Sequence, residues 1–194
     1  MEELVLTILS QNTSDVNSGR AYEALRERYP TWERLARARP SDLAVVIRPG
    51  GLANVKAPRI LSILREIDER SDGSFDLSWM RRASTAKVRE YLLSLPGVGP
   101  KTAACVVAFS LGRPALPVDT HVHRVARRLG LIDQRTDAAK AHDVLEEDVP
   151  AGIQIDMHVG LIRLGREICR AGRPRCEACP LQDLCPTAPE YLPG

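Results

Sequence analysis

The sequence predicts an all-α protein, and three features of the chain carry this prediction. Apolar residues recur at intervals of three and four, which places them on one face of a helix, as in Val122, Val125 and Leu129. No segment shows the sustained apolar-polar alternation of a half-buried strand. Capping residues such as Ser14 and breakers such as the turn at 49–51 separate the helical patterns.

Ten helices are expected, because capping residues and helix breakers divide the apolar pattern into separate segments. The first helix contains residues 4–8, and the second runs from Ser14 or Asp15 to about Tyr29. The third begins at Thr31, and the fourth runs from Ser41 to the turn at 49–51. The other six are expected near 56–70, 84–94, 100–111, 119–129, 136–148 and 154–168. After Cys169 the periodicity stops. The remaining segment is rich in proline, so something other than a hydrophobic core must order it: Pro174, Pro180, Pro186, Pro189, Pro193.

Length and composition set the class of protein. A chain of 194 residues with 44% hydrophobic content can bury a core as one domain or two small ones. It lacks the roughly 18 uninterrupted apolar residues of a membrane span, and it does not begin with a signal peptide. We therefore expect a cytoplasmic protein with no membrane association, and a monomer, because no long apolar surface stripe is evident.

The placement of arginine favours a nucleic-acid partner. Of 27 basic residues only four are lysine, although a GC-rich genome explains such a bias equally well. Position is more informative than the total, because residues 163–175 hold five arginines opposed by one glutamate, whereas residues 143–148 are acidic. This asymmetry fits a face that binds a polyanion.

Four cysteines near the C-terminus predict a metal site. Cys169, Cys176, Cys179 and Cys185 follow the spacing C-x6-C-x2-C-x5-C, which lets four sulfurs converge on one centre. In a cytoplasmic chain this pattern indicates metal rather than disulfides. The ligand type alone allows zinc or an iron-sulfur cluster. Cys105 lies outside the spacing among apolar neighbours, so we expect a small buried core residue.

A glycine-rich segment at 95–102 predicts a tight hairpin between two helices. Gly97 and Gly99 flank Val98, so the backbone can turn sharply and expose amides to an anion such as a DNA phosphate. A plain turn between antiparallel helices is the alternative. Two residues after Gly99 comes Lys101, and Asp119 follows eighteen residues later in Val-Asp-Thr-His.

Together these motifs resemble the endonuclease III family of DNA repair glycosylases. The hairpin Leu-Pro-Gly-Val-Gly, the lysine, the aspartate and the cysteine spacing occur in the family's order, and the resemblance covers nearly the whole chain. It implies the helix-hairpin-helix DNA glycosylase fold. A helical barrel domain would span 1–115 with the hairpin at 95–101, and an iron-sulfur cluster domain would span 116–194 with the cluster loop at 169–185.

The resemblance also implies the chemistry. Lys101 matches the family's nucleophile, which attacks the sugar C1′ and forms a Schiff base, once desolvation or neighbours such as Arg124 favour the neutral amine. Asp119 matches the carboxylate that stabilises positive charge on the sugar, and it also suits a helix N-cap. The four cysteines would bind a [4Fe-4S] cluster, whose loop presents Arg170, Arg173 and Arg175 to DNA phosphates.

A glycosylase must flip its target base out of the duplex and fill the gap, so wedge residues are expected. Gln11 and Asn12 compete for one such role in the loop after the first helix. Leu52 is the second candidate, in a segment resembling the family's Gly-Leu-x-Asn-x-Lys-Ala, although a leucine returning to the core is an alternative. His121 is a candidate phosphate ligand, with packing or capping as the alternative.

The expected function is base-excision repair of double-stranded DNA containing damaged bases or abasic sites. By resemblance, the enzyme removes oxidised pyrimidines and cleaves the strand by β-elimination, in a bacterial or archaeal nucleoid. One alternative is a monofunctional adenine or mismatch-thymine glycosylase, which usually lacks the hairpin lysine; another is a catalytically silent DNA-binding module. The chain departs from the family at Pro100, which has neither the cation nor the amide donor of many relatives. It also begins inside what would be the family's second helix, so we expect either a truncated chain or a smaller cluster domain.

Overall fold

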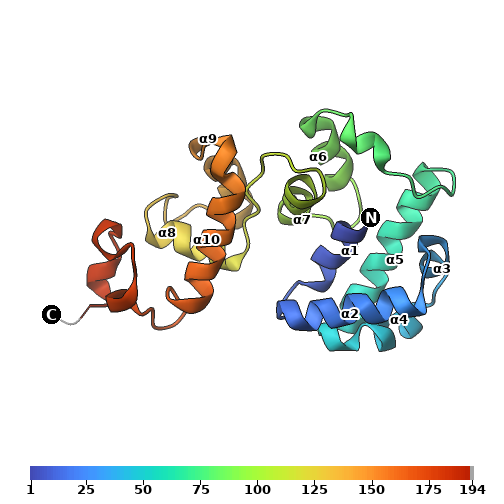
Figure 1. Cartoon of the computed structure of the whole chain (residues 1–194), viewed down its shortest axis with the longest axis horizontal. Coiled ribbons are helices and arrows are strands. Elements are labelled where there is room, and N and C mark those ends of the chain that lie inside the picture. Colours follow the sequence, from blue (N-terminus) through green and yellow to red (C-terminus); the bar gives the residue numbers. More distant parts are fainter. Residues whose placement is uncertain (193–194) are drawn as a thin grey trace. The chain divides into compact units, whose positions relative to one another are not determined.

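The computed structural model describes residues 1–192, and every regular element within them is helical, which confirms the all-α prediction (Figure 1). The chain divides into two compact units, Met1–Leu111 and Gly112–Gly194. Residues 193–194, and with them Pro193 of the expected tail, lie outside the described residues. The irregular segment 111–119 contains both this division and the boundary expected after residue 115.

The first unit is built around its longest helix. Its elements are α1 (Glu2–Leu9), α2 (Asp15–Arg28), α3 (Trp32–Ala36), α4 (Pro40–Val46), the 3-10 turn η1 (Arg48–Gly50), α5 (Ala53–Arg70), the 3-10 turn η2 (Ser78–Arg81), α6 (Thr85–Leu93), α7 (Pro100–Cys105) and the π-helical turn η3 (Val106–Ser110). Helix α5 packs against α3, α4 and α1, and α1 packs against α2 and α7. Buried Ile60, Leu64 and Ile67 recur along α5 at helical spacing and face this core.

Helix starts follow the predicted caps with two exceptions. The hydroxyls of Ser14 and Thr31 accept backbone amides of α2 and α3, as expected. Helix α4 begins at Pro40 rather than Ser41, because proline lacks the amide that a first helical residue leaves unpaired. Helix α5 begins at Ala53, earlier than the expected residue 56, since the Leu52 carbonyl already accepts the amides of residues 55 and 56 at 2.9 Å each.

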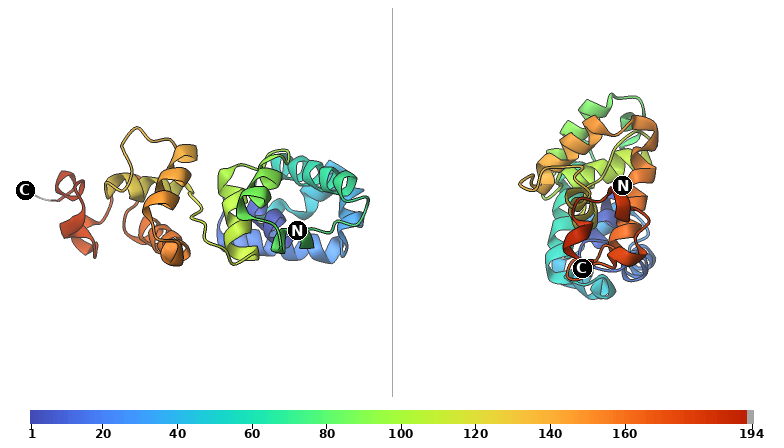
Figure 2. Two further views of the ribbon diagram at one scale, coloured as in Figure 1. Left: turned by 90° about the horizontal axis from the view of Figure 1, so that it is seen from above. Right: turned by 90° about the vertical axis from the view of Figure 1, so that its left-hand side faces the viewer.

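The second unit packs three helices and a tail of short turns. Its elements are α8 (Thr120–Arg128), α9 (Ala138–Asp148), the 3-10 turn η4 (Ala151–Ile153), α10 (Gln154–Glu167) and the 3-10 turns η5 (Cys176–Ala178), η6 (Gln182–Leu184) and η7 (Ala188–Glu190). Helix α8 packs against α9 and α10 over a core that includes Val122, Val125 and Leu161. Figure 2 shows the tail in red, composed of turns rather than long helices.

A carbonyl at the C-terminal end of α8 bonds to two residues of the tail. Arg128 O accepts the hydroxyl of Thr187 at 2.7 Å and the thiol of Cys185 at 3.3 Å. In the described part of the chain, no helix has the length and apolar composition that crossing a bilayer requires.

Candidate functional site

The predicted hairpin lies between α6 and α7. Gly97 has φ of +74°, a conformation that strains any residue with a side chain, and it is exposed at the tip of the turn. Val98 is buried and anchors the turn, while Gly99 is the extended residue that precedes α7. The sharp turn expected from the two glycines is therefore present, with its apolar residue used for packing.

Lys101 lies in the first turn of α7, partly buried, with Cys105 one turn further along. Burial raises the pKa of the Cys105 thiol, and the nearby Lys101 ammonium opposes that shift. Cys105 is 4% exposed, as expected for a core residue. The side chain of Lys101 thus lies over the buried face of α7 rather than fully in solvent.

Both predicted wedge loops have a residue in the left-handed backbone conformation. Asn12 has φ of +52° and is exposed, while Gln11 beside it is partly buried. Leu52 has φ of +49° and its residue surface is 52% exposed, so it does not return to the core. An exposed leucine in a conformation that costs about 1–2 kcal/mol requires a strong local constraint.

Lys56 supplies such a constraint. Its ammonium is buried and donates hydrogen bonds of 2.7 Å to the carbonyls of Leu9 and Gly50, which lead into the two loops. Burial lowers the pKa of Lys56, because the charged form loses solvation. Lys56 is the lysine of the segment that resembles the family's Gly-Leu-x-Asn-x-Lys-Ala, but no role was predicted for it from the sequence. The available signal was its position six residues after Gly50, within the segment that resembles the family motif.

Arg59, one turn after Lys56 on α5, was also missed. Its Nη1 donates to Gln11 Oε1 at 2.9 Å. Its side chain also crosses Gly97, since a β-carbon there would lie 3.0 Å from Arg59 Nε. Arg59 therefore connects the first wedge loop with the hairpin.

Asp119 is the N-cap of α8. Its Oδ1 accepts the amides of His121 and Val122 at 2.8 Å each, which confirms the capping interpretation. Its other oxygen, Oδ2, accepts no hydrogen bond from any residue in 1–192. One oxygen is thus anchored to the backbone of α8.

The side chains of His121 and Arg124 contact each other, and Arg124 also donates hydrogen bonds to backbone carbonyls of the second unit. Arg124 Nη2 lies 3.1 Å from His121 Nδ1. Arg124 also donates to Gly165 O at 2.8 Å and to Cys169 O at 3.0 Å. Arg124 therefore binds the start of the cysteine loop to α8, and its predicted contact with DNA stays a prediction.

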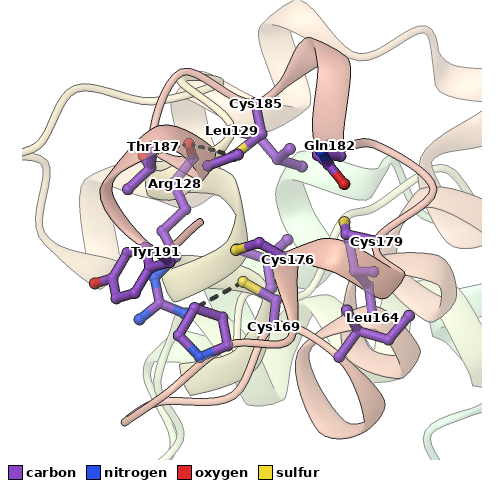
Figure 3. A pocket seen from close by; sticks show the side chains of 14 residues that line it. Arg128, Leu129, Leu164, Cys169, Cys176, Cys179, Gln182, Cys185, Thr187 and Tyr191 are labelled. Atoms are coloured by element: carbon purple, nitrogen blue, oxygen red, sulfur yellow. Dashed lines mark hydrogen bonds between the residues drawn. The ribbon is translucent and has the colours of Figure 1, made fainter. Parts of the chain in front are cut away.

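The four predicted ligand cysteines line one pocket, together with side chains of α8 and α10 (Figure 3). The walls between the thiols are largely apolar, including Leu129, Leu164 and Ile168. Arg128 Nη1 donates to Cys169 Sγ at 3.3 Å, and its guanidinium lies 5.3 Å from the Tyr191 ring centroid. Soft thiolates, a dry wall and a cationic donor to sulfur suit an iron-sulfur cluster.

Within residues 1–192, no three histidine, cysteine, aspartate or glutamate side chains are gathered so that one ion binds them all. The thiols border the pocket instead. The arginines between the first two cysteines, Arg170, Arg173 and Arg175, are exposed, and Arg175 also donates to Glu167 O.

Comparisons with known proteins identify the family. Residues 5–151 match the HhH-GPD superfamily of base excision DNA repair proteins, and residues 169–185 match the iron-sulfur binding domain of endonuclease III. The chain is 38% identical over 182 residues to endonuclease III of Thermotoga maritima, covering 94% of this chain and 80% of that protein. The chain belongs to the endonuclease III family. It is accordingly a base-excision DNA glycosylase/lyase with a [4Fe-4S] cluster.

Solved structures agree with the family assignment. A trapped covalent intermediate of endonuclease III with DNA, an estranged-adenine complex, superposes with a TM-score of 0.83 at 30% identity, covering 97% of this chain and 84% of that one. A thermostable thymine-DNA glycosylase superposes with a TM-score of 0.79 at 26% identity, over 97% of this chain and 84% of that one. The helix-hairpin-helix glycosylase fold is thus confirmed.

Loss of one ligand thiol is expected to remove the cluster. In Cys176→Ala we expect the visible iron-sulfur absorption to disappear and the tail to become protease-sensitive, because metal binding supplies the order that its prolines cannot. Cys105→Ala is the matched control, since it removes a buried thiol outside the pocket. Absorption spectra and limited proteolysis measure both. Full absorption in Cys176→Ala would contradict the ligand assignment.

Proposed function

We propose that the enzyme removes oxidised pyrimidines from duplex DNA and then cleaves the strand by β-elimination through Lys101. The observation that carries this proposal is a lysine in the first turn after the hairpin, in a chain of the endonuclease III family. An amine at this position distinguishes a glycosylase that forms a Schiff base from one that activates water.

In the proposed reaction, the neutral amine of Lys101 attacks C1′ of the flipped nucleotide. The glycosidic bond breaks, the base leaves with its electron pair and takes up a proton, and the opened sugar forms an iminium with Nζ. Removal of a 2′ proton then expels the 3′ phosphate, and water hydrolyses the Schiff base to release the lysine. Each step needs a group that holds charge or moves a proton near the sugar.

Asp119 is proposed to supply that charge. Because its Oδ1 is anchored to the amides of α8, the carboxylate has a set direction, and Oδ2 is available to positive charge that develops on the sugar as the base departs. A carboxylate whose position is set before the reaction needs no reorganisation in the transition state. The same residue is therefore proposed to serve as both cap and catalyst.

The remaining predicted site residues are proposed to bind DNA. Gln11, Asn12 and Leu52 are proposed wedges, and their loops are held by Lys56. The other proposed contacts are Gly97, Val98, Gly99, His121, Arg124, Arg170, Arg173 and Arg175. Cys169, Cys176, Cys179 and Cys185 would hold the [4Fe-4S] cluster, which would cross-link the arginine-bearing loop and so order it. We further propose that the enzyme acts as a monomer in the nucleoid.

A panel of duplexes tests the proposal. The wild-type protein is incubated with duplexes containing thymine glycol opposite adenine, adenine opposite guanine, or thymine opposite guanine, and products are separated with and without alkali. We expect strand cleavage without alkali on thymine glycol alone. Base loss that is revealed only by alkali at either mismatch would support a monofunctional glycosylase instead, and binding without base loss would support a silent module.

A further inference from the structure

The side chain of Gln11 has a defined orientation in the first unit. Its Oε1 accepts from Arg59 Nη1 at 2.9 Å. Arginine has no acceptor, so the carbonyl oxygen must face it and the amide nitrogen must point away. No residue in 1–192 accepts a hydrogen bond from that nitrogen. The two N–H donors of Gln11 thus point away from Arg59 and have no partner among the described residues.

The side chain of Arg59 packs against the hairpin. Its side chain lies across Gly97, where a β-carbon would be 3.0 Å from Nε, 3.1 Å from Cδ and 3.2 Å from Cγ of Arg59. It follows Lys56 on the same helix face, and Lys56 fixes the carbonyl of Leu9 two residues before Gln11. No described carboxylate pairs with Arg59, so its interactions are with Gln11 and the hairpin rather than with an acidic neighbour.

We propose that Arg59 is a positioning residue, which presents Gln11 as a hydrogen-bond donor to the base left unpaired when its partner is flipped. This inference rests on the proposed role of Gln11 as a wedge. An unpaired purine exposes an acceptor on its pairing edge, N1 in adenine or O6 in guanine. Without Arg59, Gln11 loses the charged hydrogen bond that holds its side chain, so neither the side-chain conformation nor the direction of the amide is fixed.

A double-mutant cycle tests this coupling. Excision of thymine glycol opposite adenine is measured under single-turnover conditions for wild type, Arg59→Met, Gln11→Ala and the double variant. Methionine keeps an unbranched stem beside Gly97 but has no donor. We expect each single variant to be about tenfold slower, the size of one charged hydrogen bond, and the double variant to be no slower than either.

Arg65→Met is the matched control. Arg65 lies on the same helix and donates to Ala36 O at 3.4 Å, apart from the loops, so its loss should leave the rate unchanged. Equal melting temperatures for the two methionine variants exclude a general loss of fold. Multiplicative effects in the double variant, or a wild-type rate in Arg59→Met, would overturn the proposal, because Arg59 would then not act through Gln11.

A second readout needs no excision. A duplex carries 2-aminopurine opposite a tetrahydrofuran abasic-site analogue, so the fluorescent purine is the unpaired base. We expect wild type to change its fluorescence, and Arg59→Met and Gln11→Ala to lose that change equally. If wild type fails to excise thymine glycol yet shows this pattern, the proposed function fails and the positioning role stands. A fluorescence change in Arg59→Met equal to that of the wild type would contradict the positioning role and leave the proposed function standing.

Discussion

Lys101→Ala is expected to lower the rate of strand cleavage at thymine glycol by at least about 10³-fold, because no other group replaces the covalent nucleophile. Binding of the duplex should persist, since phosphate contacts are spread over several residues and one cation contributes only a part of them. Single-turnover cleavage and duplex affinity are measured on the same preparation.

Lys87→Ala controls for the loss of a lysine. Lys87 is exposed on α6, the other helix of the hairpin, so the substitution removes the same charge from the same unit. It should cleave at the wild-type rate. Cleavage by Lys101→Ala within tenfold of wild type would mean that another amine, or water, performs the chemistry.

Asp119→Asn is expected to slow base excision by about 10²- to 10³-fold while leaving the fold intact. Asparagine caps a helix as well as aspartate does, because its side-chain oxygen accepts the same two amides, yet it carries no charge to stabilise a cationic sugar. The rate is measured in single turnover, and the stability by thermal unfolding.

The matched control is Asp137→Asn. Asp137 caps α9 and accepts the Lys140 amide at 2.8 Å, so it shares the structural role without the proposed catalytic one. It should change neither rate nor stability. If Asp119→Asn excises as fast as wild type, whereas Asp119→Ala loses about 1 kcal/mol of stability, Asp119 is a cap and nothing more.

Local chemistry made most of the fold predictable. Caps and breakers act on neighbouring residues, so Ser14 and Thr31 marked the starts of α2 and α3 from sequence alone. The start of α4 at Pro40 was missed because a hydroxyl and a proline competed for adjacent positions. The regular helix expected over 100–111 ends at Cys105 and continues as a π-helical turn, a change of hydrogen bonding that periodicity does not reveal.

Site residues could be predicted where they are close together in the sequence. They could not be predicted where the contact joins residues that are distant in the sequence. The cysteine spacing led to one pocket because the loop is short. Lys56 and Arg59 contact Leu9 and Gln11 over more than forty residues of sequence, so only packing reveals them. The sequence likewise does not reveal that Asp119 accepts both backbone amides through the same oxygen, Oδ1.

The most direct test of the account is to locate the covalent bond that borohydride traps. The wild-type protein is reduced with borohydride while it processes a thymine glycol duplex, and the adduct is digested and mapped by mass spectrometry. The account predicts one modified peptide with the sugar on Lys101, and no adduct in Lys101→Ala. An adduct on another lysine or on the N-terminal amine, or none at all during active cleavage, would contradict it.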